Sequence, residues 1–210
     1  MGAVNFGLYY FHTPDLMRAV MLILAELMVI GALMYDGYMD TSDGVFSARD
    51  RERMLEIMKD SHVGSNAVIA LVCLVLLKVA AYTVIQPVML SFVLVALFVA
   101  TRTFMVTYIV NYKYARKTGI GHMFKAYAKP SYTFIAFALC IGIVCALGWW
   151  VELLFGSATG FVAAAAVTFV ICQGIARFLC GQLGGLTGDT YGFLTECGVV
   201  VYLMAAVYLV

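Results

Sequence analysis

The chain has little charge: Asp, Glu, Lys and Arg make up 12% of its 210 residues, whereas hydrophobic residues make up 64%. A water-soluble protein of this length needs far more polar surface. A helix that crosses a bilayer needs roughly 20 consecutive apolar residues, and several such runs occur here. The scarcity of charge therefore excludes an ordinary soluble globular protein and indicates an integral membrane protein.

The chain also lacks a basic patch and metal-binding cysteine pairs. Its net charge is +1, and Lys and Arg form no block interleaved with aromatic residues, so we expect no nucleic-acid partner. The six cysteines form no CxxC pair and lie near no histidine at ligand spacing. We therefore expect them to be small buried residues.

The apolar runs predict an all-α, polytopic membrane protein with about six spans in one membrane domain, residues 1–210. The expected spans are about 16–35, 66–85, 87–110, 131–151, 159–179 and 191–208. Pro87 suits the first turn of a helix, so spans two and three should form a hairpin.

Lys and Arg residues predict the orientation. With six spans, the loops 36–65 and 111–130 and the turn after Arg177 lie on one side, and they carry most of the basic residues. By the positive-inside rule this side is cytoplasmic, which predicts a multi-pass protein of the cell membrane with its active face in the cytoplasm. Residues 48–61 are amphipathic and predict a cytoplasmic helix in the membrane interface; a helix in a soluble loop is the alternative.

Three aspartates, Asp36, Asp40 and Asp43, follow the first apolar run at spacings of four and three residues. On a helix they share one face, where their mutual repulsion favours a bound cation. Oxygen ligands on short side chains suit Mg²⁺, which substrate phosphates usually help to coordinate. The alternative is a solvated helix cap. Asp60 adds a further carboxylate.

A glycine-rich segment, residues 181–189, lies between the last two spans, with Arg177 one turn before it. Clustered glycines allow backbone N–H groups to approach an anion, and the helix that follows presents its N-terminus. A tight interhelical turn explains the glycines about equally well. The basic segment 114–121 could hold an anionic substrate or could simply set the topology.

Three ionisable residues fall within the expected spans. Such residues tend to pair or to line cavities. Glu26 and Arg102 lie about 15 Å and 12 Å from the cytoplasmic ends of their spans, so we predict that they pair. Lys78 lies nearer the outer end of its span and is expected to extend its amine to the membrane surface.

Together these segments resemble the cobalamin synthase family, also called adenosylcobinamide-GDP ribazoletransferases. The resemblance rests on Asp36-Gly37 with Asp40-Thr41-Ser42-Asp43-Gly44, on Met58-Lys59-Asp60-Ser61, on Tyr114-Ala115-Arg116, and on Gly184-Gly185-Leu186-Thr187-Gly188-Asp189. It runs from about Gly31 to the C-terminus. The chain departs from the family in having Met34 where a histidine is usual, His62 where an arginine is usual, and a shorter N-terminal stretch.

The resemblance implies a Mg²⁺-dependent transfer that joins adenosylcobinamide-GDP to α-ribazole or its phosphate and releases GMP, the end of cobalamin biosynthesis. The expected partners are these substrates and the bilayer, with a homo-oligomer or other enzymes of the pathway as further candidates. We predict that Asp36, Asp40, Asp43, Asp60 and Asp189 are catalytic, and that the first three bind the metal. The predicted substrate-binding residues are Lys59, Arg102, Arg116, Arg177, Gly184, Gly185, Thr187 and Gly188.

Two other functions remain as alternatives. A CDP-alcohol phosphotransferase also uses spaced aspartates at a membrane face, but Met39 and Asp40 stand where its motif has Ala-Arg. A transporter would account for ionisable residues within spans, but no inverted repeat is visible.

Overall fold

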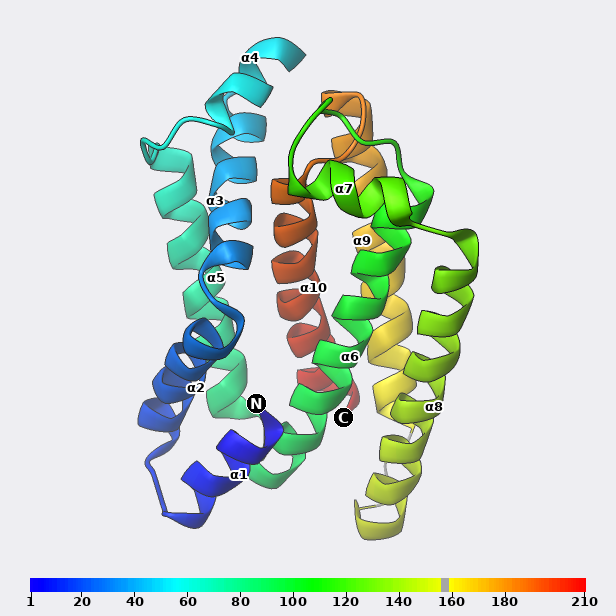
Figure 1. Ribbon diagram of the computed structural model, residues 1–210. Coiled ribbons are helices and arrows are strands. Elements are labelled where there is room, and N and C mark those ends of the chain that lie inside the picture. The colour runs from blue at the N-terminus through cyan, green and yellow to red at the C-terminus, as the bar shows by residue number, and fades with distance from the viewer. Residues whose placement is uncertain (156–158) are drawn as a thin grey trace.

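The computed structural model describes residues 1–155 and 159–210, and this part of the chain is helical without a β-strand (Figure 1). Its helices are α1 Gly2–Tyr10, α2 Asp15–Ile30, α3 Leu33–Phe46, α4 Arg51–Ile57, α5 Ser65–Val84, α6 Pro87–Asn111, α7 Ile120–Tyr127, α8 Pro130–Phe155, α9 Thr159–Leu183 and α10 Gly188–Leu209. Within these residues, five helices are long and apolar enough to span a membrane, and the number is six if α2 and α3, which are bent against each other, count as one broken span. The predicted all-α polytopic fold is confirmed.

The first predicted span, 16–35, is wrong, because these residues do not form one continuous helix. α2 ends at Ile30 and α3 begins at Leu33, with an angle of 98° between them. Gly31 stands at the break with a φ of +76°, a conformation that glycine adopts without strain. α3 then continues to Phe46, so the three aspartates lie on one helix, as their spacing predicted, although this helix extends into the stretch 36–65 that was expected to be a loop.

Outside the expected spans, the sequence predicted one short helix, whereas the described residues form three: α1, α4 and α7. The helix expected over 48–61 is α4, which covers Arg51–Ile57 and is capped by the Asp50 side chain. Its Met54 packs with Leu183 at the end of α9, so the apolar face of α4 lies against the bundle. Two short helices, α1 and α7, were not predicted.

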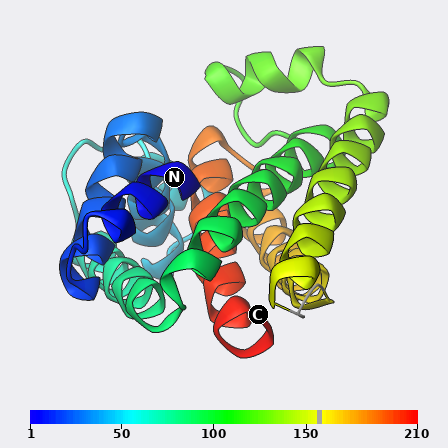
Figure 2. The ribbon, with the colours of Figure 1, turned by 90° about the horizontal axis from the view of Figure 1, so that it is seen from below.

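α10 is the centre of the bundle and lies between the α2–α5 group and the α6, α8 and α9 group (Figure 2). Gly37 of α3 and Gly192 of α10 allow these helices to touch: a Cβ at Gly37 would lie 2.7 Å from the backbone oxygen of Asp189. Close to this contact, Tyr38 and Phe193 stack with ring centroids 5.0 Å apart. The acidic face of α3 is therefore held beside the start of α10.

A buried polar cluster corrects the predicted pairing of charges within the membrane. Lys78 is fully buried, and its Nζ donates to Glu26 Oε1 (3.0 Å), Glu196 Oε2 (2.6 Å) and the Tyr35 hydroxyl (2.9 Å). Glu26 thus pairs with Lys78 rather than Arg102, and Lys78 does not extend to the membrane surface. Depth along a span was a poor guide because α2 packs against α5, which carries Lys78.

Candidate active site

The predicted polar segments gather at one end of the bundle, which is the upper end in Figure 1. The acidic half of α3, α4, α7 and the turn from α9 to α10 meet there, and the chain termini lie toward the other end. Segments that are more than a hundred residues apart in the sequence thus meet at the α4 end of the bundle.

A polar cavity of about 410 Å³ opens at this end. Acidic and basic side chains line most of it, together with the segment that joins α4 to α5. The lining residues are Asp36, Met39, Asp40, Asp43, Met58, Lys59, Asp60, Ser61, His62, Val63, Ala67 and Arg116. Four of the predicted catalytic aspartates therefore line one cavity, together with two predicted substrate-binding cations.

A second cavity of about 380 Å³ adjoins the first, because Asp36 and Arg116 line both. It lies between α3, α6, α7 and α10, and apart from its charged end it is apolar and aromatic. The other lining residues are Leu33, Met34, Met105, Ile109, Tyr114, Gly119, Gly121, Phe124, Gly188, Asp189 and Tyr191.

Arg116 lies where the two cavities adjoin. Its Nη1 contacts Asp189 Oδ2 at 2.8 Å, whereas Nε and Nη2 are buried and find no partner among the described residues. Buried donors without partners are costly, so they mark a place where a ligand oxygen would be stabilised. The Arg116 guanidinium is thus held by one carboxylate and still has free donors for an anion.

The turn before α10 is what positions Arg116. Leu186 N donates to Lys113 O and Ala115 N donates to Leu186 O, both at 2.8 Å, so the two loops are joined by their backbones. Gly185 has a φ of +151° and leaves no room for a Cβ beside Ala115 N, which lies 2.8 Å from its ideal position. This close approach brings Arg116 next to Asp189.

These contacts give the glycine-rich segment a structural reason. Gly184 has a φ of +70° and lies against the Arg51 guanidinium, which donates to Leu183 O. Thr187 is buried and caps α10 through its hydroxyl, which accepts from Thr190 N. The alternative of a tight interhelical turn therefore accounts for Gly184, Gly185 and Thr187, while Gly188 lines the apolar cavity. Their contact with substrate stays a prediction.

Asp43 differs from its two neighbours on α3. Its carboxylate accepts from Gly64 N (2.6 Å) and Ala67 N (2.8 Å), the free backbone donors at the start of α5. It therefore caps α5 from another helix, a role that requires a carboxylate but no metal. Asp36 and Asp40 have no such backbone partner within the described residues, and Asp40 lies within electrostatic reach of Asp36, Asp189 and Arg116.

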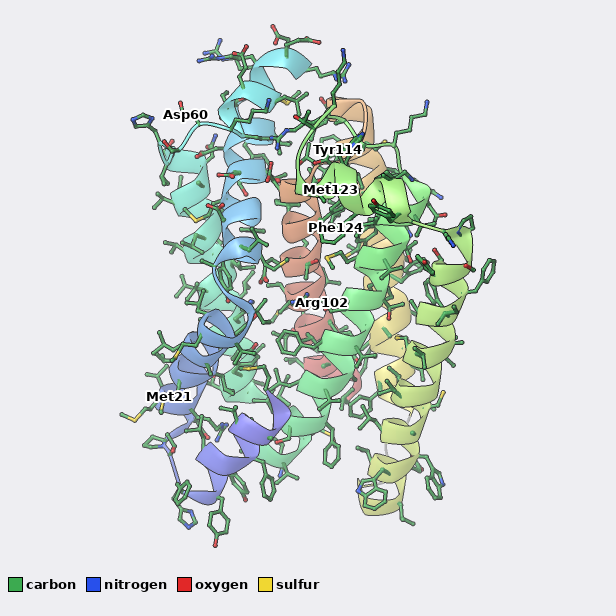
Figure 3. All side chains as sticks on the ribbon, in the orientation of Figure 1. Met21, Asp60, Arg102, Tyr114, Met123 and Phe124 are labelled. Atoms are coloured by element: carbon green, nitrogen blue, oxygen red, sulfur yellow. The ribbon has the colours of Figure 1, made fainter. Side chains whose placement is uncertain are left out.

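Asp60 lies exposed at the rim of the polar cavity, where Figure 3 shows it near the upper end of α5. It accepts from His62 N (3.0 Å), and its Oδ1 lies 2.6 Å from His62 Nδ1. These two contacts lower the pKa of the Asp60 carboxyl, the backbone hydrogen bond most strongly. The carboxylate is thus kept ionised at the cavity mouth.

The other basic residues predicted to bind substrate differ in whether they line a cavity. Lys59 lines the polar cavity, as predicted for a substrate contact. Arg102 does not: it lies deeper in the bundle on α6 (Figure 3), with Nη1 buried and without a described partner. Arg177 lies on α9 beside Tyr112, outside both cavities.

Sequence reasoning missed three residues that matter here. Glu196 is a carboxylate within a span, a rare feature that should have grouped it with Glu26 and Lys78 as an ionisable residue expected to pair. Tyr35 and Tyr191 carried no such signal, because tyrosine is common in membrane helices and its hydroxyl role depends on its neighbours.

The aspartates do not form a closed metal site by themselves. Within the described residues, no group of three or more Asp, Glu, His or Cys side chains could hold an ion alone. The oxygen-rich set of Asp36 and Asp40 nevertheless suits Mg²⁺, which is normally held by one or two carboxylates with water and substrate phosphates completing the shell. Mg²⁺ binding therefore stays a prediction, and Asp36 and Asp40 are suitable ligands for it.

Comparisons with known proteins agree on one family. A model of the family described as cobalamin-5-phosphate synthase matches residues 1–207, so the similarity begins well before Gly31, where the motifs had placed its start. An adenosylcobinamide-GDP ribazoletransferase of Desulforamulus reducens is 36% identical over 200 residues, 93% of this chain and 76% of the relative. One of Clostridium novyi is 34% identical over 190 residues, 89% of this chain and 71% of the relative. No solved structure matches the chain.

Proposed function

The chain belongs to the cobalamin-5-phosphate synthase family, and on that premise we propose that its reaction takes place where the polar and apolar cavities meet. Its activity is that of an adenosylcobinamide-GDP ribazoletransferase, a transferase of cobalamin biosynthesis. Neither the phospholipid enzyme nor the transporter is favoured. One observation carries the location: Asp36 and Arg116 line both cavities, so two substrates bound side by side would share them.

The polar cavity suits the pyrophosphate of adenosylcobinamide-GDP. Lys59 and Arg116 supply positive charge, and the unpartnered Nε and Nη2 of Arg116 can donate to phosphate oxygens. Asp36 and Asp40 would hold Mg²⁺ against the same phosphates, with Asp43 kept on the cap of α5. When bound, the metal neutralises charge on the pyrophosphate and on the departing GMP.

The transfer then follows the chemistry of phosphoryl substitution. The ribazole hydroxyl oxygen forms a bond to the phosphorus that carries the cobinamide, the bond from that phosphorus to the GMP phosphate breaks, and GMP leaves with the bonding electrons. The hydroxyl proton passes to a carboxylate, for which we propose Asp189, since it lines the apolar cavity and stands outside the metal set. Arg116, now facing phosphate, stabilises the charge that develops.

We also propose that this end faces the cytoplasm of a cell-membrane protein, because loops at this end carry most of the Lys and Arg residues. A cysteine at Thr118 is expected to react with an impermeant maleimide from the cytoplasmic side of oriented vesicles. A cysteine at Thr13, in the loop between α1 and α2, is the matched control and is expected to react from the opposite side. Labelling of both from the same side would overturn the orientation.

The activity itself is tested in lipid vesicles with adenosylcobinamide-GDP, α-ribazole and Mg²⁺. We expect GMP and a cobalamin product in equal amounts, and neither without the metal. A parallel reaction with a CDP-activated lipid and an alcohol provides the control for the phospholipid enzyme. Release of CMP there, with no GMP in the first reaction, would contradict the assignment.

A further inference from the structure

The apolar cavity has the character of a small-molecule site. Its volume, about 380 Å³, falls within the range of about 300–1,000 Å³ that is common for such sites, and its polar groups are few and lie together. Tyr114 and Phe124 contribute aromatic rings from the loop before α7 and from α7 itself, and Figure 3 labels both at the α7 end of the bundle. A flat aromatic ligand fits such a lining better than a strongly polar one does.

One buried hydrogen-bond donor that lines this cavity has no partner among the described residues. The Tyr191 side chain is 4% exposed, and its hydroxyl finds no hydrogen-bond partner among the described residues. A buried hydroxyl without a partner costs free energy, which an acceptor on a ligand would recover. Tyr191 lies in the first turn of α10 and lines the same cavity as Asp189.

Resting on the proposed function, we propose that this cavity binds the base of α-ribazole, with the Tyr191 hydroxyl donating to the ring nitrogen that carries no ribose. This base is flat and apolar and offers that nitrogen as its acceptor. Its ribose would then point toward Asp36, Arg116 and Asp189, the charged end that adjoins the polar cavity. The ribazole hydroxyl would meet the pyrophosphate there.

A lipid acyl chain is the competing occupant, because the cavity lies among membrane helices. An acyl chain has no acceptor for Tyr191 and would leave a buried hydroxyl and three charged side chains against hydrocarbon. α-Ribazole leaves neither without a partner, because its base accepts from the Tyr191 hydroxyl and its ribose hydroxyls face the charged side chains.

The first test compares Tyr191→Phe with Tyr82→Phe. Tyr82 on α5 is also a buried tyrosine whose hydroxyl lacks a described partner, but it lies outside the cavity. Loss of one neutral hydrogen bond is expected to weaken α-ribazole binding about three- to tenfold in equilibrium dialysis, and to raise the KM for α-ribazole similarly. The KM for adenosylcobinamide-GDP should change less than about twofold, and Tyr82→Phe should change neither.

The second test varies the ligand. Two ligands are compared in competition with α-ribazole. One is the base of α-ribazole with a methyl group in place of the ribose, and the other is its indole counterpart, in which CH replaces the free ring nitrogen. The unaltered protein is expected to bind the base that has the free ring nitrogen about three to ten times more tightly than the indole, and Tyr191→Phe should bind both equally. Equal binding of the two bases by the unaltered protein would overturn the hydrogen bond.

A third comparison tests the cavity rather than the hydrogen bond. Phe124→Ala should weaken α-ribazole binding, whereas Phe134→Ala, an exposed phenylalanine on α8, should leave it unchanged. Unchanged α-ribazole affinity in both Tyr191→Phe and Phe124→Ala, or equal losses for both substrates, would overturn the proposal. Since binding is measured without turnover, a protein that binds α-ribazole as described but forms no product would contradict the proposed function alone.

Discussion

Two clusters of charged residues share helix α10: a closed cluster of Glu26, Lys78 and Glu196, and an open cluster of Asp36, Asp40, Asp189 and Arg116. In the middle of the bundle, Lys78 stands between Glu26 and Glu196, and all three side chains are 2% exposed or less. At the α4 end, Asp189 pairs with Arg116, and these side chains are 25% and 16% exposed. Both clusters contain more carboxylates than cations. The difference lies in access and in the donors left without partners.

This difference separates a structural role from a reactive one. In hydrocarbon a charge without a partner is so costly that Lys78 and its carboxylates must stay together, which ties α2, α5 and α10 to one another. At the open end Arg116 retains two free donors and can contact phosphate while it keeps or exchanges Asp189. Tyr35 joins the closed cluster and Asp36, the next residue of α3, belongs to the open one. The structural cluster thus holds in place the helix that carries the acidic residues.

The largest expected effect comes from breaking the closed cluster. Lys78→Met removes the shared cation and leaves two buried carboxylates without it, a change that typically costs about 3–5 kcal/mol. The melting temperature in detergent should fall by roughly 10 °C or more. Lys59→Met, which removes an exposed lysine at the open end, is the control and should change stability by less than about 0.5 kcal/mol. Equal melting temperatures for the two variants would contradict the structural role of Lys78.

The contact between α3 and α10 is tested at Gly37. An alanine Cβ there would lie 2.7 Å from the Asp189 backbone oxygen, so Gly37→Ala should force the helices apart at a cost of about 1–3 kcal/mol. Turnover should fall as well, because Asp36 and Asp189 would separate. Gly174→Ala on α9 is the control, since no atom lies within 4 Å of its added methyl group. A loss of stability as large at Gly174 would refute this account of the contact.

Asp43 stands between the two roles, since it lines the polar cavity and caps α5. Asp43→Asn retains one acceptor oxygen of two, so we expect a loss of about 1 kcal/mol in the free energy of unfolding, as for a weakened helix cap. Asp36→Asn, without such backbone partners, should not destabilise the fold. Thermal unfolding of both variants measures the difference. If Asp43→Asn were as stable as the unaltered protein, the capping role would be wrong and Asp43 would again be a candidate metal ligand.

The smallest effect is expected at Asp60. The pKa of its carboxyl is lowered by hydrogen bonds from His62, so any stability the contact provides is present at neutral pH and is lost as pH falls through the lowered pKa. His62→Ala removes the imidazole and keeps the backbone N–H, so the pKa should rise only part of the way to its ordinary range. A carbon-13 NMR titration of the Asp60 carboxyl measures the shift. No shift in His62→Ala would show that the imidazole contact is absent in solution.

Sequence reasoning was most successful where composition and spacing decide the structure. Apolar runs predicted the spans, and the spacing of Asp36, Asp40 and Asp43 predicted one helical face, because both depend on neighbours along the chain. It failed at Gly31, where tertiary packing bends an apolar run that could otherwise have continued as one helix. The roles of Asp43 and Lys78 were missed for the same reason: their partners lie on other helices, and a single sequence does not say which helices touch.

The central claim is that the open cluster carries out the reaction, whereas the closed cluster stabilises the fold. A side-by-side comparison of Asp40→Asn with Glu196→Gln tests this claim most directly. Each removes one carboxylate charge, and both GMP release and thermal unfolding are measured in the same lipid preparation. We expect Asp40→Asn to lose turnover by about a hundredfold or more and to melt like the unaltered protein. Glu196→Gln should melt at a lower temperature and keep turnover close to normal while folded. Normal turnover in Asp40→Asn, with turnover lost in folded Glu196→Gln, would contradict the account.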